Sequence, residues 1–202
     1  MQRMSSANTS EVSLTDGEEN VTKSDILSVA ERGGDMLLYH GSNTAVEEPR
    51  LIGQTRGLDF GAGFYLTTNE AQAVRFSEIV VNRRKGGVST VSIYEFDMEV
   101  AECTLAVHRF ERADGEWLRF VTDNRLMTYQ GAVYDVVVGA VANDTVMPTL
   151  QAFLGGFINE EATLITLKTS KLVDQVCLKS ERSLSLLRFV KFYEVKRVRT
   201  NG

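Results

Sequence analysis

Cysteine, histidine and long apolar runs are scarce in this 202-residue chain, which has two cysteines and two histidines. Cys103 and Cys177 lie far apart in apolar surroundings, a spacing that excludes a disulfide framework or a paired metal-binding motif and predicts two buried free thiols. Free thiols favour a reducing, cytoplasmic compartment. No stretch approaches the roughly 18 apolar residues of a membrane span. We therefore expect no membrane span and no metal site.

The sequence also has no long block of residues with the same charge. The formal net charge is −5, and the one basic run that stands out is "RRK" at 83–85. Nucleic-acid binding driven by phosphates needs a basic surface, so we expect no general nucleic-acid binding, although a local basic patch stays open.

Several catalytic signatures are missing as well. The chain contains no G-x-x-x-x-G-K-[ST] phosphate loop, no G-x-S-x-G elbow and no H-E-x-x-H zinc motif. The G-x-G within "GLDFGAGFYL" has no third glycine at Rossmann spacing and no helix directly behind it. These absences leave the common nucleotide-binding and hydrolase folds without support.

The chain divides into a polar tail and one patterned domain. Residues 1–34 contain no aromatic residue and are rich in Ser, Thr, Asn, Asp and Glu, so we expect them to be disordered, or partly helical over 23–34. Their start has no apolar core typical of a signal peptide. Residues 35–202 form the expected domain.

Within that domain, strands and helices alternate without a regular βαβ rhythm, which predicts the α+β class. Apolar patterning predicts strands at 36–40, 63–68, 88–97, 133–141, 174–180 and 188–198. It predicts helices at 68–87, 114–125, 143–156, 159–168 and 181–187.

Helix starts are predicted from capping residues. Thr67 and Glu70 have the spacing of a capping box before the 68–87 helix, whose apolar face includes Phe76. Asn143 or Asp144 is expected to cap the 143–156 helix, and Asn159 the 159–168 helix. Trp117 and Phe120 share the apolar face of the 114–125 helix and are expected in the core. The second histidine, His108, falls in "AVHRFERADGE", which reads as a surface loop.

Four ordered stretches carry the functional signal: "LYHGSN" at 38–43, "DFGAGFYLT" at 59–67, "YDVVVGAVAND" at 134–144 and "DQVCLKSERSLSLL" at 174–187. Together they resemble the ADP-ribosyltransferase superfamily, and in detail a bacterial family of uncharacterised domains placed in it. The resemblance covers roughly residues 36–190 and implies a split antiparallel β-sheet core with flanking helices.

The resemblance also implies roles for the first two stretches, with NAD+ as the substrate and no metal. His40 would hydrogen-bond a ribose hydroxyl of the adenosine half, because a neutral imidazole has one donor and one acceptor. Gly41 would bond the nicotinamide amide through its backbone, and Ser42 would assist. Tyr65 would stack on the nicotinamide ring. A structural histidine at a strand end is the alternative for His40.

The remaining implied residues surround these. Gly61 and Gly63 would leave room for the ligand beside the sheet. Gln175 falls where the superfamily's catalytic glutamate usually stands, so it offers the ribose 2′-hydroxyl an amide in place of a carboxylate. Glu181 could supply the missing charge if the chain folds back, or could simply begin a helix. Further polar candidates at loop and helix ends are Asp59, Asn143 and Asp144.

The implied activity is that of an NAD+-dependent mono-ADP-ribosyltransferase acting on an unidentified acceptor, macromolecular rather than small. Segments 44–58 and 98–116 are expected to contact this acceptor. Alternatives on the same fold are an NAD+ glycohydrolase and an NAD+-dependent RNA 2′-phosphotransferase. A non-catalytic module binding NAD+ or ADP-ribose, and a scaffold without a ligand, belong to other classes. As a toxin or effector, the protein would be delivered into a target cell's cytoplasm.

Overall fold

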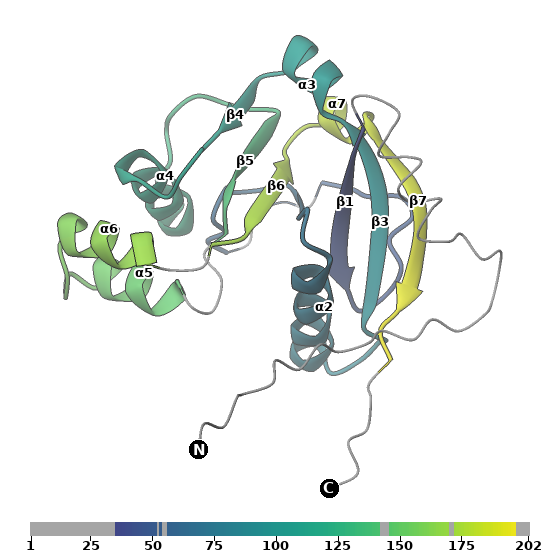
Figure 1. Cartoon of the computed structure of the whole chain (residues 1–202), viewed down its shortest axis with the longest axis horizontal. Helices are drawn as coiled ribbons and strands as arrows, with labels where there is room; N and C mark the ends of the chain where they lie inside the picture. The colour runs from purple at the N-terminus through teal and green to yellow at the C-terminus, as the bar shows by residue number, and fades with distance from the viewer. Residues whose placement is uncertain (1–34, 52, 54–55, 142–145, 170–171, 197–202) are drawn as a thin grey trace, which may run out of the picture.

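The computed structural model describes residues 35–51, 53, 56–141, 146–169 and 172–196. The expected N-terminal tail and the capping candidates Asn143 and Asp144 lie outside these ranges. Within them the expected α+β class is confirmed, because two β-sheets are combined with six helices (Figure 1).

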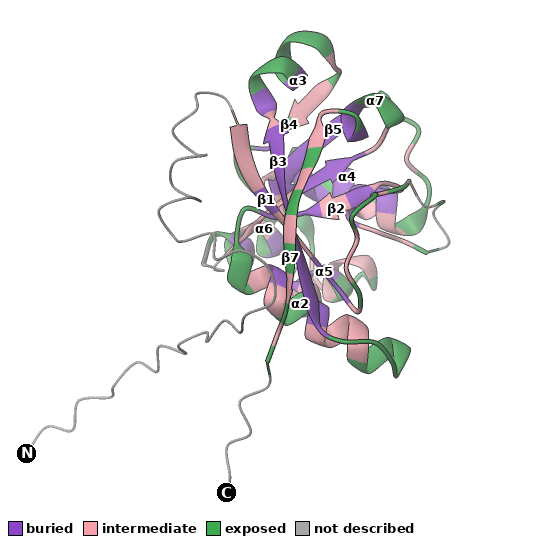
Figure 2. Cartoon of the chain, turned by 90° about the vertical axis from the view of Figure 1, so that its right-hand side faces the viewer, coloured by how far each residue is buried: buried purple, intermediate pink, exposed green. Residues whose placement is uncertain are grey.

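One sheet has three antiparallel strands in the order β1-β3-β7. These are β1 (Asp35–Ser42), β3 (Thr90–Asp97) and β7 (Leu187–Glu194). The long middle strand β3 is almost entirely buried, as its run of β-branched and aromatic residues predicts (Figure 2). β7 pairs on one side with β3, and exposed residues alternate along it with partly buried ones.

The second sheet has four strands in the order β2-β6-β5-β4, antiparallel except for the parallel pair β4·β5. They are β2 (Phe64–Leu66), β6 (Asp174–Leu178), β5 (Val136–Ala140) and β4 (Val107–Arg109). A single bridge between Tyr39 and Thr67 joins this sheet to β1. Among the described residues, main-chain pairing between the two sheets is thus limited to this bridge.

Helices cover the outer faces of both sheets, and short helices close one end. Figure 1 shows α2 beside β1, α4, α5 and α6 gathered beside the four-stranded sheet, and α3 and α7 close to the upper ends of the strands. The helices are α2 (Glu70–Arg84), α3 (Met98–Thr104), α4 (Gly115–Leu126), α5 (Met147–Leu154), α6 (Glu160–Thr169) and α7 (Glu181–Leu184).

Three apolar clusters follow from this layering. The inner core lies between the sheets and includes Leu38, Phe64, Tyr94 and Val176. The outer core packs α4, α5 and α6 against the four-stranded sheet. The α2 core packs α2 against β1 and β3. Neighbouring residues on one strand therefore belong to different cores, since side chains alternate between the faces of a sheet.

The predicted caps were partly wrong. α2 begins after Asn69, whose side chain accepts a hydrogen bond from the Gln72 N–H at 3.0 Å, so Thr67 does not cap it. Thr67 is instead held in the bridge to β1. α5 begins at Met147 with Val146 in the cap position, later than expected, because Pro148 at N1/N2 suits a helix start.

Other corrections concern exposure and short elements. Cys103 is exposed, whereas Cys177 is buried as predicted. Phe76 is 44% exposed and does not belong to the core face of α2. His108 lies on β4 and not in a loop; its ring stacks on Tyr134 with 4.6 Å between ring centroids. A three-residue strand is too short for a period-2 pattern to reveal.

Candidate functional site

The candidate site lies where β1 and β2 part. The Tyr39 N–H donates to the Thr67 carbonyl at 2.9 Å, and the Thr67 N–H donates to the Tyr39 carbonyl at 3.0 Å. Beyond this pair, toward Ser42, no main-chain hydrogen bond joins β1 to β2 in the described part of the chain. A gap in main-chain pairing therefore opens directly after Tyr39.

His40 spans this gap with its side chain. Its Nδ1 lies 2.8 Å from the Tyr65 carbonyl oxygen, and its ring stacks on Phe64 with centroids 4.5 Å apart. A carbonyl only accepts, so Nδ1 carries the proton and Nε2 is left as an acceptor. Burial lowers the pKa of His40, which keeps the ring neutral. Among the described residues, Nε2 has no hydrogen-bonding partner.

Gly41 presents backbone groups to the same gap. In an antiparallel ladder the main-chain groups of alternate residues point to the same neighbouring strand. Tyr39 directs its N–H and C=O toward β2, so Gly41, two residues further on, does the same. Within the described ranges neither group finds a partner there. The gap is thus lined by one main-chain donor and one main-chain acceptor.

The packing of α2 explains why position 41 is a glycine. A Cβ there would lie 2.0 Å from the Ala73 carbonyl oxygen of α2. The missing side chain therefore lets α2 pack onto β1; the space it leaves is filled by protein. Ser42 follows at the end of β1, buried, with Thr90 as its register partner.

The His40 side chain contacts the backbone carbonyl of Tyr65, but the two side chains lie on different faces of the sheets. Phe64 and Leu66 point into the inner core, whereas Tyr65 packs on the outer core. Its hydroxyl donates to the Gly61 carbonyl at 2.5 Å and accepts from the Phe60 N–H at 3.2 Å. Burial raises the pKa of this phenol. The ring is thus held in one position by the glycine-rich loop before β2.

Gly61 and Gly63 serve that loop's packing, contrary to expectation. A Cβ on Gly61 would lie 2.6 Å from Asn124 Oδ1, and one on Gly63 would lie 2.5 Å from the Cys177 sulfur. Gly61 also has φ +78°, a conformation that favours glycine. Lys179 ties the loop down by donating to the Phe60 and Ala62 carbonyls. The space beside both glycines is occupied by protein.

Gln175 lies near Tyr65 in the sheet. Cys177 pairs with Tyr65 across β2·β6, and Gln175 is two residues away on the same face of β6. Its Oε1 is buried and has no hydrogen-bonding partner in the described structure. Leaving an acceptor in that state costs about 1–3 kcal/mol. Gln175 shares the outer-core face of the four-stranded sheet with Cys177 and Tyr65, whereas the His40 ring stacks on Phe64 of the inner core.

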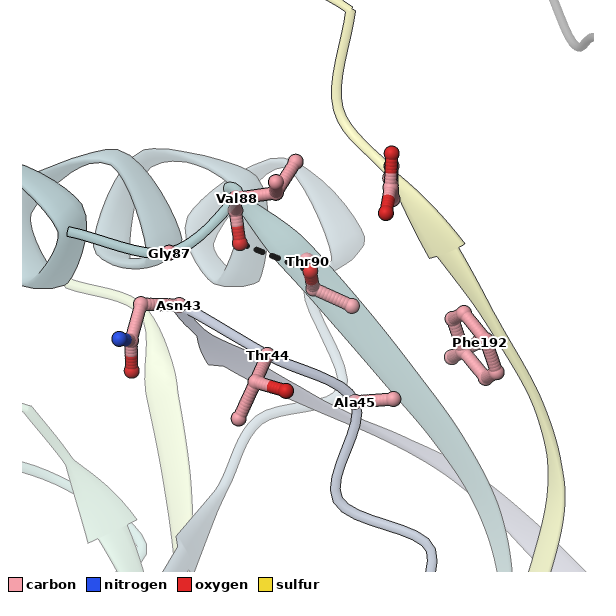
Figure 3. Close-up of a pocket in the computed structure, with 8 residues that line it drawn as sticks. Asn43, Thr44, Ala45, Gly87, Val88, Thr90 and Phe192 are labelled. Carbon is pink, nitrogen blue, oxygen red and sulfur yellow. Dashed lines mark hydrogen bonds between the residues drawn. The ribbon is translucent and has the colours of Figure 1, made fainter.

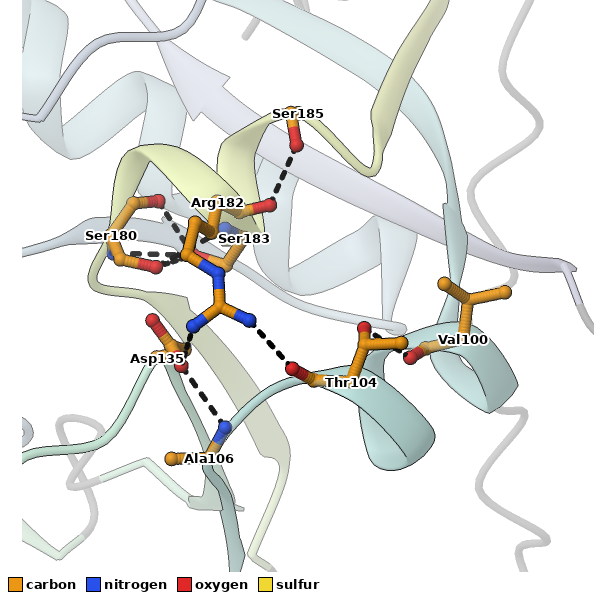
Figure 4. Close-up of polar contacts among 8 residues, drawn as sticks. All are labelled: Val100, Thr104, Ala106, Asp135, Ser180, Arg182, Ser183 and Ser185. Atoms are coloured by element: carbon orange, nitrogen blue, oxygen red, sulfur yellow. Dashed lines mark hydrogen bonds and ion pairs between the residues drawn. The ribbon is translucent and has the colours of Figure 1, made fainter.

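Glu181 is not brought to this site. β6 rises about 3.3 Å per residue, so its far end lies roughly 10 Å from Gln175, and the chain then enters α7 without folding back. Glu181 is exposed at the first position of α7. Next to it, Arg182 donates to the Thr104 carbonyl at 2.7 Å and faces Asp135 at 3.8 Å (Figure 4). This network fixes α7 against the α3 end of the molecule.

The other polar candidate inside the described ranges is Asp59. It is buried and forms an ion pair with Arg125 of α4 at 2.5 Å. That contact anchors the glycine-rich loop to α4.

Sequence reasoning missed Asp174, the carboxylate next to Gln175. Its Oδ2 accepts from the Thr68 hydroxyl at 2.6 Å, and its backbone carbonyl accepts from the Thr67 hydroxyl at 2.9 Å. These contacts fasten the start of β6 to the β2–α2 connection. They span more than a hundred residues of sequence, so no local pattern could have revealed them.

The described residues contain neither a cluster suited to a metal ion nor a helix suited to cross a membrane. No group of three or more His, Cys, Asp or Glu side chains there is placed to hold a metal ion. No helix in those ranges is long and apolar enough to cross a membrane.

Comparison with known proteins places the chain in a family. No curated protein matches it. A family model matches residues 36–189, which include most of β1, the split and the start of β7. The chain therefore belongs to the family described as "Protein of unknown function (DUF3990)".

Proposed function

We propose that this protein binds NAD+ at the split between β1 and β2 and transfers its ADP-ribosyl group to an acceptor. The observation that carries the proposal is the pair of Gly41 main-chain groups without a partner among the described residues, beside a neutral His40. The strand order β4-β5-β6-β2, followed across the split by β1-β3-β7, supports an ADP-ribosyltransferase-like core.

A primary carboxamide is the natural complement of Gly41. The amide NH₂ of nicotinamide donates to the Gly41 carbonyl, and the amide oxygen accepts from the Gly41 N–H, so both unpaired backbone groups are satisfied together. His40 Nε2, as an acceptor, takes the hydroxyl hydrogen of a ribose. The fixed tautomer of His40 makes that contact directional.

The reaction breaks the bond between ribose C1′ and the nicotinamide ring nitrogen, which keeps the electron pair. The acceptor's nucleophile forms the new bond to C1′ and loses its proton to solvent. C1′ acquires oxocarbenium character on the way, so negative charge near it accelerates the step. Gln175 accepts a hydrogen bond from the ribose 2′-hydroxyl through Oε1 but contributes a dipole only.

The uncharged Gln175 favours one alternative of another class, a module that binds NAD+ without turning it over. Water as the acceptor, which makes the protein a glycohydrolase, uses the same geometry and differs in the product alone. Tyr65 borders the site through its backbone carbonyl, and its ring is held by Gly61. The acceptor is proposed to be a macromolecule.

The test is incubation of the purified full chain with NAD+ labelled in the adenylate, alone and with cell lysate, while nicotinamide release is measured. Label on a macromolecule supports transfer, and free ADP-ribose supports hydrolysis. Binding by calorimetry without nicotinamide release supports the module. Absence of both binding and release excludes the proposal.

Gln175→Glu sharpens this test. If Gln175 lies at the ribose, the new carboxylate raises nicotinamide release about tenfold or more. Glu181→Gln is the matched control because it changes a nearby acidic position that the site does not use. Equal rates for wild type and Gln175→Glu would remove Gln175 from the site.

A further inference from the structure

A pocket opens at the end of the three-stranded sheet, apart from the split. The loop 43–45, the link Gly87–Val88, and the strand residues Thr90, Phe192 and Glu194 line it (Figure 3). Thr90 is the register partner of both Ser42 and Glu194, so the pocket continues the inner face of this sheet beyond the inner core. Nothing in the proposed NAD+ chemistry uses it.

Hydrogen bonds join two of the segments that line this pocket. The Val88 N–H donates to the Asn43 carbonyl at 2.9 Å, and Asn43 Nδ2 donates to the Gly86 carbonyl at 3.1 Å. A Cβ on Gly87 would lie 2.2 Å from the Asn43 carbonyl oxygen. The α2–β3 link and the loop after β1 are therefore in close contact, and the cavity exists before any ligand arrives.

The lining combines an aromatic ring with a carboxylate. Phe192 is 44% exposed and Val88 47% exposed, although both are large apolar side chains. Ala45 also borders the pocket, and Figure 3 shows its methyl group on the side of the Phe192 ring. Glu194 has no ion pair or hydrogen bond with any described residue. The combination leaves an apolar wall beside an unneutralised negative charge.

We propose that this pocket binds the guanidinium group of an arginine side chain from a protein partner. A guanidinium is flat, stacks on an aromatic face and pairs with a carboxylate through two parallel N–H donors. The methylene stem of arginine covers Val88 and Ala45. An anion is repelled by Glu194, and a purely apolar ligand would desolvate this carboxylate without compensation.

Among the described arginines, Arg84 lies next to the pocket residue Asn43 and is engaged with it. Arg84, in the last turn of α2, donates to Asn43 Oδ1 at 3.2 Å. It thus positions Asn43 and does not pair with Glu194, for which no ionic partner lies among the described residues. A lysine ammonium is more strongly hydrated and lacks the flat shape, so it fits the ring and carboxylate less well.

The experiment is an NMR titration of the full chain, labelled with ¹⁵N, with three blocked tripeptides: Gly-Arg-Gly, Gly-Lys-Gly and Gly-citrulline-Gly. Citrulline keeps the shape of arginine and removes its charge. We expect saturable shifts at the Thr90 and Phe192 amides with the arginine peptide, and binding at least about fivefold weaker with each of the others.

Two variants complete the test. Glu194→Gln and Phe192→Leu should each weaken the arginine peptide about fivefold, whereas Glu161→Gln, an exposed control on α6, should leave it unchanged. No saturable shifts in the pocket, equal binding of all three peptides, or unchanged binding by Glu194→Gln each overturns the proposal. Because peptide binding does not require NAD+, this result stands apart from the outcome of the nicotinamide-release assay.

Discussion

His40 and His108 occupy similar positions and differ in their partners. Each lies on a strand, and each ring stacks on an aromatic neighbour, with centroids 4.5 Å apart for His40 and Phe64 and 4.6 Å apart for His108 and Tyr134. His40 donates to a backbone carbonyl at the split, whereas His108 Nε2 faces the Glu116 carboxylate at 3.6 Å. A carbonyl fixes one tautomer, and this leaves the opposite nitrogen of His40 as a defined acceptor.

The largest of the predicted effects is expected for Gly41→Ala, at the residue next to His40; position 108 has no such glycine beside it. The added Cβ meets the α2 backbone at 2.0 Å, and backbone cannot move aside cheaply. We expect the free energy of unfolding, measured by urea denaturation, to fall by about 3 kcal/mol. Gly86→Ala is the control, since a Cβ there has no heavy atom within 4 Å. Equal loss in both variants would show that α2 does not rest on Gly41.

The same asparagine substitution at each histidine tests the comparison itself. In His40→Asn the amide nitrogen replaces Nδ1 and can still donate to Tyr65, but the acceptor at Nε2 is lost. We expect nicotinamide release to fall about 100-fold, as for loss of one oriented polar group. His108→Asn should change the rate less than about twofold. Thermal unfolding of both variants checks that each remains folded. Similar rates of nicotinamide release in the two variants would contradict a special role for His40.

The pH dependence of stability should also depend on His40. Its pKa is lowered in the folded state by burial, so the unfolded chain binds a proton more readily. The stabilising contribution is complete above the unfolded pKa of about 6.5 and declines as the pH falls toward the folded value. Melting temperatures between about pH 7.5 and 5.5 should fall more steeply for wild type than for His40→Asn. Parallel curves would mean that His40 titrates normally.

The smallest effect is expected at Glu181→Gln. The side chain is exposed at the start of α7, where a negative charge favourably meets the helix N-terminus, so its removal costs at most about 0.5 kcal/mol. Nicotinamide release should remain within about twofold of wild type. A much larger loss would bring α7 into the site and contradict its present position beyond the end of β6.

Local signals in the sequence located most elements, and long-range pairing was beyond them. The buried strand at β5 and the core positions Trp117 and Phe120 follow from apolar periodicity, and both are confirmed. The Asn159 cap of α6 is confirmed by its side-chain bond to the Ala162 N–H at 2.9 Å. Each of these depends on residues within one turn or one strand.

The site could be anticipated as a set of residues but not as an arrangement. His40 and Gly41 are predicted site residues because they stand in one of the four ordered stretches that resemble the ADP-ribosyltransferase superfamily. Whether their polar atoms face a gap depends on where the pairing of β1 with β2 ends. The Tyr39–Thr67 bridge sets that point, and its two residues are 28 positions apart in the sequence. The role of Asp174 depends on an even longer separation. Spacing along the chain carries no information on either.

The bridge between Tyr39 and Thr67 also has an experimental use. Its two hydrogen bonds are the main-chain connection between β1 and β2 within the described residues. The amide protons of Tyr39 and Thr67 therefore exchange with solvent deuterium at a rate set by how often the sheets part at this point. The exchange rates of these two amides thus report how often the split opens. A ligand that bonds to Gly41 across the split slows the exchange of both amides.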